Sequence, residues 1–116
     1  MYRIKISALA QARYPELEDR YENPLPDPCS LHIGQEWISD ECTMPPGFCP
    51  SAWQSLYPYI FALASGADNL FDGWMKKPGT AMVSCSDGFR PMSFYLEKIE
   101  SDPDYSEQNS SAESCE

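Results

Sequence analysis

The stretch Cys49–Gly66, "CPSAWQSLYPYIFALASG", holds the clearest helical pattern of this chain. Its apolar residues recur every three or four positions, the spacing that places side chains on one face of an α-helix. Gly66 is typical of a position just after a helix end. Because an interior proline costs about 3 kcal/mol, Pro58 predicts a kink, or two short helices that meet near Tyr57. The predicted apolar face comprises Trp53, Leu56, Tyr57, Ile60, Phe61 and Ala64.

Four other segments have the patterns of β-strands. Apolar and polar residues alternate from Tyr2 to Ala8, and Glu36–Ser39 is a short candidate that follows a glycine. The segments "TAMVSC" (80–85) and "RPMSFYLEKI" (90–99) are joined by "SDGF". Asp87-Gly88 predicts a hairpin there, because both residues tolerate a positive φ. We therefore expect an α+β fold: a small antiparallel sheet or half-barrel with one kinked amphipathic helix across it.

The remaining segments set the predicted boundaries of the domain. Residues 13–28 contain four prolines, so we expect a long wrapping loop with at most one turn of helix, at Glu16–Arg20. A chain of 116 residues suits one core. We expect a single globular domain over residues 1–100. Residues 101–116, with five acidic residues and no basic one, are expected to form a disordered acidic tail.

The charge of the chain excludes several classes of partner. The formal net charge is -10, from 18 acidic and 8 basic residues. Nucleic acid and membrane surfaces both need clustered lysine and arginine, and here the basic residues are scattered. The N-terminal segment is too polar for a signal peptide or a membrane span. We therefore expect a cytoplasmic protein that works on a small molecule or a partner protein, and whose five cysteines are thiols or metal ligands rather than disulfides.

Cys49 is the first candidate for a chemical role. It precedes Pro50, and because proline favours the first helical position, Cys49 is a natural N-cap residue. The helix dipole and the free amides there favour the thiolate form of a cysteine. Ser51, with Gln54 three residues later, is an alternative helix start. In a third interpretation, Cys49 is a small buried apolar residue.

Other candidate residues lie on both sides of the helical segment. Cys29 and His32 are separated by two residues, a spacing at which both side chains can reach one metal ion. His32 is the only histidine, so a Cys-His or Ser-His pair would need it. Cys85 ends a predicted strand, next to the turn with Asp87. Arg90 either pairs with Asp87 to hold the hairpin or binds a substrate carboxylate.

Three segments resemble a family of small, functionally uncharacterised proteins that are mostly bacterial. The segments are "CSLHIGQEW" (29–37), "MPPGFCPSAWQSLYPYIFAL" (44–63) and "CSDGFRPMSFYLEKIE" (85–100). They are similar to the family's Cys-x-x-His-x-Gly, Pro-x-Gly-x-Cys-Pro-x-Ala-Trp and Cys-x-Asp-Gly-x-Arg-Pro motifs. The resemblance covers about residues 2–100. Cys42, the loop between Gly66 and Trp74 and the acidic tail depart from the family pattern.

The resemblance implies a set of metal ligands. Cys29, Cys49 and Cys85 stand at motif positions, and His32 stands at a frequent one. Three cysteines and one histidine suit a tetrahedral zinc site or, as the second choice, an iron site.

Three hypotheses for the function follow. The first is a metal-binding domain with Cys29, His32, Cys49 and Cys85 as ligands of zinc or iron. Its metal is structural if the site is closed, and an open site could serve a lyase, isomerase or hydrolase. The second is a metal-free thiol enzyme in which Cys49 is the nucleophile, Arg90 binds an anion, and Asp87 or His32 moves protons. The third is a protein-interaction module without catalysis.

Overall fold

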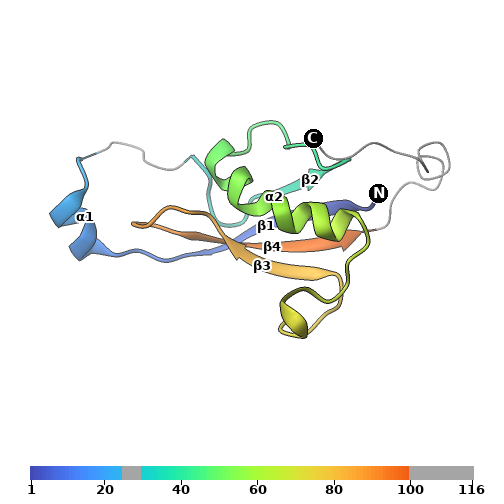
Figure 1. Cartoon of the computed structure of the whole chain (residues 1–116). Helices are drawn as coiled ribbons and strands as arrows, with labels where there is room; N and C mark the ends of the chain where they lie inside the picture. Colours follow the sequence, from blue (N-terminus) through green and yellow to red (C-terminus); the bar gives the residue numbers. More distant parts are fainter. Residues whose placement is uncertain (25–29, 100–116) are drawn as a thin grey trace.

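The computed structural model describes residues 1–24 and 30–99. Four strands form one antiparallel sheet in the order β2-β1-β4-β3, with bounds β1 (Arg3–Gln11), β2 (Glu36–Ser39), β3 (Thr80–Ser84) and β4 (Met92–Ile99). The helix α2 (Pro50–Ala64) lies across one face of this sheet (Figure 1). A short helix, α1 (Pro15–Tyr21), follows β1, and a 3-10 turn, η1 (Leu70–Asp72), follows α2. The predicted α+β class with an antiparallel sheet is confirmed.

The alternation predicted for the first strand decides which face of the sheet is buried. Ile4, Ile6 and Ala8 are buried and belong to the core that also contains the buried side of α2. The strand is longer than predicted, since β1 continues to Gln11 and its pairing with β4 shifts between Ala8 and Ala10. Such a bulge bends a strand and sharpens its twist. It leaves the end of β1 beyond the part of the sheet that α2 covers (Figure 1).

Helix α2 is one continuous element, so the alternative of two short helices is wrong. Pro58 lies inside it on the exposed side. Because proline has no N–H, the Gln54 carbonyl lacks its helical hydrogen-bond donor. Gln54 is exposed, so water can take the place of that donor. The buried side is also rotated from the predicted one. Ala52 and Leu63 are buried, whereas Phe61 is 39% exposed.

The predicted hairpin is present, but its turn differs from the prediction. Strands β3 and β4 pair from Thr80↔Glu97 to Ser84↔Ser93, which leaves a connection of residues 85–91 rather than a tight two-residue turn. Neither Asp87 nor Gly88 has a positive φ. The backbone N–H groups of Phe89 and Arg90 instead donate to Asp87 Oδ1, at 2.8 and 3.1 Å. A side chain that mimics a backbone turn in this way replaces the conformation that the Asp-Gly pair predicted.

Helix α1 lies beyond the end of β1, away from α2 (Figure 1). It extends by one residue at each end the turn predicted at Glu16–Arg20, and none of its residues is buried. Apolar burial therefore contributes little to its position, and its attachment depends on polar contacts. The predicted acidic tail, residues 101–116, lies outside the described residues.

Candidate functional site

Two of the four predicted metal ligands line one pocket. The pocket has a volume of about 390 Å³ and lies where α2 begins and β3 ends. Both Cys49 and Cys85 are free thiols that are partly exposed. The lining residues are Ser30, Cys49, Ser51, Ala52, Cys85, Ser86 and Asp87. We call this cavity the thiol pocket.

Cys49 occupies the predicted N-cap position of α2. Its φ and ψ of -75° and 120° are extended, Pro50 is the first helical residue, and the Cys49 carbonyl accepts the first helical hydrogen bond from Trp53 N–H at 2.9 Å. The side chain makes no capping hydrogen bond. Ser51 and Ala52, which also line the pocket, follow at positions whose N–H groups have no acceptor within a helix. Sγ of Cys49 therefore stands at the positive end of a helix without a capping role.

Cys85 continues the pairing of β3 with β4 by one residue. Its N–H donates to the Met92 carbonyl at 3.0 Å, and Met92 N–H donates to Cys85 Sγ at 3.4 Å. The sulfur thus accepts a backbone hydrogen bond, which fixes the side chain beside the turn.

Asp87 lines the thiol pocket but is already used by its turn. Its Oδ1 accepts the two backbone bonds from Phe89 and Arg90. The expected ion pair between Asp87 and the Arg90 guanidinium is not among the contacts of the described residues, and the two residues are linked through the Arg90 backbone instead. Asp87 therefore has a clear structural role, and its proposed role in moving protons stays a prediction.

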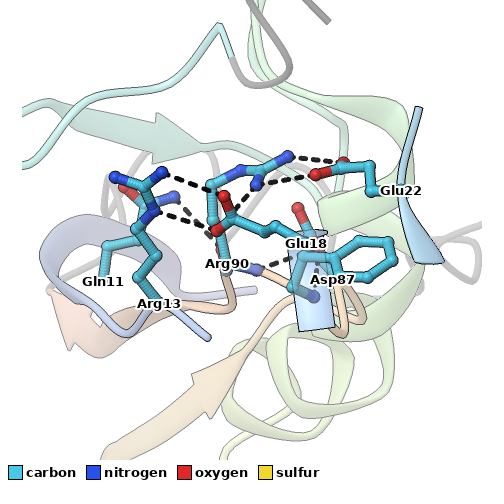
Figure 2. Close-up of polar contacts among 7 residues, drawn as sticks. Gln11, Arg13, Glu18, Glu22, Asp87 and Arg90 are labelled. Atoms are coloured by element: carbon cyan, nitrogen blue, oxygen red, sulfur yellow. Dashed lines mark hydrogen bonds and ion pairs between the residues drawn. The ribbon is translucent and has the colours of Figure 1, made fainter. Parts of the chain in front are cut away.

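Arg90 points to α1 (Figure 2). Its Nη1 and Nη2 bond to the Glu22 carboxylate at 3.0 and 2.6 Å, and Nη1 lies 2.9 Å from Glu18 Oε2. Arg13 in turn makes two bonds to Glu18, both at 2.9 Å. Only 13% of the Arg90 side chain is exposed. Since two carboxylates occupy its guanidinium, Arg90 attaches α1 to the β3–β4 connection and has little capacity left for a substrate anion.

The ion pairs shift the pKa of both partners in the expected directions. The hydrogen bond to Glu22 is the main cause that raises the pKa of Arg90 above its ordinary value; burial opposes it, and the hydrogen bond to Glu18 adds to it. The pKa of Glu18 is lowered, chiefly by its hydrogen bond from Arg13. Both groups are therefore charged over the whole neutral range.

His32 does not line the thiol pocket. His32 is exposed in the turn before β2, where its backbone N–H donates to Gln35 Oε1 at 2.7 Å. Cys29 lies outside the described residues, although the next residue, Ser30, lines the pocket. Within residues 1–24 and 30–99, no group of three or more His, Cys, Asp or Glu side chains is arranged to hold a metal ion. The structure thus brings two of the four predicted ligands, Cys49 and Cys85, to one pocket, and the metal-binding role of all four stays a prediction.

Cys42 corrects the expectation that all five cysteines are thiols or ligands. It is buried and disulfide-bonded. Its Sγ also lies 3.9 Å from Met1 Sδ. Because a disulfide sulfur carries no proton, this is a van der Waals contact rather than a hydrogen bond.

Sequence reasoning missed the partners of Arg90 and the serines of the pocket. Glu18 and Glu22 are four residues apart, the spacing that puts two side chains on one helix face, and this is the one signal that points to a shared cation. Ser51 and Ser86 carry no comparable signal. Their place in the pocket follows from the way α2 meets β3.

No family model, curated protein or solved structure matches this chain. The resemblance of the three cysteine-containing segments to a family therefore stays a prediction. No helix within the described part of the chain is long and apolar enough to cross a membrane.

Proposed function

We propose that the protein is a small metal-binding domain that holds a zinc or iron ion in the thiol pocket. The observation that carries the proposal is the convergence of Cys49 and Cys85, two free thiols from distant parts of the chain, on one cavity. Thiolates are preferred ligands of zinc and also bind iron. Two nearby thiols alone do not complete a tetrahedral site, so further ligands are needed.

Cys29 and His32 are the proposed further ligands. Ser30 lines the pocket directly after Cys29 in the sequence, which supports Cys29 more than the exposed His32. If one of the four positions is filled by water, the site is open and suits a small-molecule lyase, isomerase or hydrolase. The proposal keeps a cytoplasmic location. The disulfide at Cys42 weighs against it, because disulfides are rare in that compartment.

The test is elemental analysis of the full chain, purified without an affinity metal column, followed by titration with Co²⁺. We expect about one metal per chain and a near-ultraviolet thiolate-to-cobalt band. Cys49→Ser and Cys85→Ser should lose both signals, whereas Ser65→Ala, a one-atom change at the exposed C-cap of α2 and away from the thiol pocket, should keep them. Serine is itself a good N-cap residue, so Cys49→Ser should leave α2 intact. A wild-type chain that carries no metal and gives no cobalt band would exclude the proposal.

The second candidate is a thiol enzyme with Cys49 as its nucleophile. The unused sulfur of Cys49 at the start of a 15-residue helix favours it. The pairing of Arg90 with two glutamates removes its expected anion binder. After chelator treatment, iodoacetamide at mildly acidic pH should modify Cys49 faster than Cys85, as measured by peptide mass spectrometry. Equal rates at the two cysteines would count against an activated nucleophile.

A further inference from the structure

A second concave site lies apart from the thiol pocket and shares no residue with it. It has a volume of about 550 Å³, within the range of about 300–1,000 Å³ that is usual for small-molecule sites. We call it the lysine-rimmed groove. It is lined by Trp74, Met75, Lys76, Lys77, Met82 and Tyr95.

The groove lies on the face of the sheet that α2 leaves uncovered. Met82 of β3 pairs with Tyr95 of β4, and Tyr95 pairs with Ser7 of β1. Along β1, Ser7 lies between Ile6 and Ala8, whose side chains belong to the core on the α2 side of the sheet. Because neighbouring side chains of a strand point to opposite faces, Ser7, Tyr95 and Met82 point away from α2. Met82 is 42% exposed, and it supplies an apolar wall on the open face.

The loop after η1 supplies the opposite wall and is held in place. Phe71, Asp72 and Gly73 all have a positive φ, which turns the chain sharply before Trp74. The Trp74 ring packs edge-on against Phe71, with ring centres 5.5 Å apart, and Phe71 packs on Tyr59 of α2 at the same distance. Thr80 Oγ1 donates to the Lys77 carbonyl at 2.6 Å at the other end of the loop. Trp74 is nevertheless 77% exposed. A large aromatic ring that is fixed in an exposed position next to other exposed apolar side chains is typical of a binding surface.

The charges of the groove indicate the sign of a ligand. Lys77 is paired with Glu97. Lys76 is exposed, and the described residues provide no ion-pair partner for it. One ammonium group is therefore uncompensated beside an apolar groove, in a chain whose net charge is -10. At physiological ionic strength, salt screens the interaction between exposed charges that are more than about 8 Å apart. A ligand at the rim therefore experiences the charge of Lys76 more strongly than the negative charges elsewhere on the chain.

We propose that the lysine-rimmed groove binds a small anionic amphiphile, an acyl or aryl chain that ends in a carboxylate. The chain lies against Trp74, Met82 and Tyr95, and the carboxylate pairs with Lys76. A neutral apolar molecule leaves the ammonium group unpaired, and a cationic one is repelled by it. The proposal does not depend on the metal site, because the two cavities have no residue in common.

The test uses the full chain with monomeric decanoate as the probe and tryptophan fluorescence as the signal. Decanoate should shift the emission to shorter wavelength in a saturable way, because it removes the Trp74 ring from water. The shift should be absent in Trp74→Phe, which keeps the other two tryptophans. Lys76→Glu should weaken the affinity about five- to tenfold, the scale of one surface ion pair and its reversal.

Two controls decide between charge at the rim and less specific causes. Lys5→Glu makes the same change of charge at a lysine that pairs with Glu36 and does not line the groove, and it should bind decanoate like the wild type. Decanol should bind more weakly than decanoate. Equal affinities for decanol and decanoate, or equal losses in the two lysine variants, would overturn the proposal.

Two further outcomes would assign the groove to another occupant and also overturn the proposal. The first is a shift with phosphatidylcholine–phosphatidylglycerol vesicles but none with monomeric decanoate, which would indicate a membrane surface. The second is a shift that depends on protein concentration without any ligand, which would indicate a second copy of the chain.

Discussion

Replacing Pro58 with alanine is expected to raise the free energy of unfolding by about 2 kcal/mol. Pro58 lies inside α2, where it cannot donate to the Gln54 carbonyl. An interior proline is about 3 kcal/mol less favourable than alanine, and the stiffening of the unfolded chain by proline returns about 0.4–1 kcal/mol of this. Since Pro58 is exposed, the substitution removes no core packing and the difference of about 2 kcal/mol should be seen in full.

Pro50→Ala is the matched control in the same helix. Pro50 is the first residue of α2, where a missing N–H costs nothing and a fixed φ is favourable. We therefore expect no gain in stability from this variant. Urea unfolding and thermal unfolding, both monitored by circular dichroism, would compare the two variants with the wild type. For a domain of this size, about 2 kcal/mol corresponds to an increase in Tm of roughly 8–16 °C. An unchanged Tm for Pro58→Ala, or an equal increase for Pro50→Ala, would refute the argument.

Three further predictions concern the core and the attachment of α1. Leu56→Ala should lower the free energy of unfolding by about 2–5 kcal/mol in urea titrations, because Leu56 is a fully buried residue of α2 in the core between the helix and the sheet; a loss under 1 kcal/mol would contradict this packing. Arg90→Gln should speed amide hydrogen exchange in residues 15–21 while exchange in β1 and β4 stays slow, because Arg90 joins α1 to the sheet through Glu18 and Glu22; unchanged exchange in α1 would show that other contacts hold it. In the folded protein the pKa of Glu18 lies below its ordinary value of 4.5. The ionised Glu18 therefore stabilises the fold fully above pH 4.5, and this contribution is lost as the pH falls through the lower folded pKa. Glu18→Gln should reduce the dependence of Tm on pH below 4.5, and identical acid profiles for the variant and the wild type would argue against the shift.

Local patterns in the sequence predicted most of the fold because each pattern depends on nearby residues. The alternation in β1, the Glu36–Ser39 strand and the start and end of α2 all follow from periodicity and capping residues. The prediction errors lie where contacts with residues outside the local pattern determine the structure. Phe61 fits the apolar face by spacing, yet the sheet contacts the side of α2 that carries Leu63. The turn at Asp87 depends on two side-chain bonds that a dipeptide preference does not include.

The candidate site was predictable to the extent that cysteines at element ends mark it. Cys49 and Cys85 were placed at a helix start and a strand end, and they line the same pocket. The role of Arg90 was not predictable, because its partner Glu22 is 68 residues away. That contact exists only after β1 and β4 have paired and brought α1 beside the turn. The lysine-rimmed groove likewise joins a loop and two strands that no motif connects.

The strand order has a consequence for how the chain folds. The central pair of the sheet joins β1 to β4, with Arg3 opposite Ile99. The chain loses entropy when it brings two segments so far apart in sequence together, and it does so before the contacts between them form. This order of events slows folding in proteins in which most strand pairings are distant in sequence. During synthesis, β1 has to wait for its neighbour until residue 99 has left the ribosome. Until then β1, whose Ile4 and Ile6 end up fully buried, has only β2 as a paired strand, and the nascent chain most needs protection from aggregation during this period.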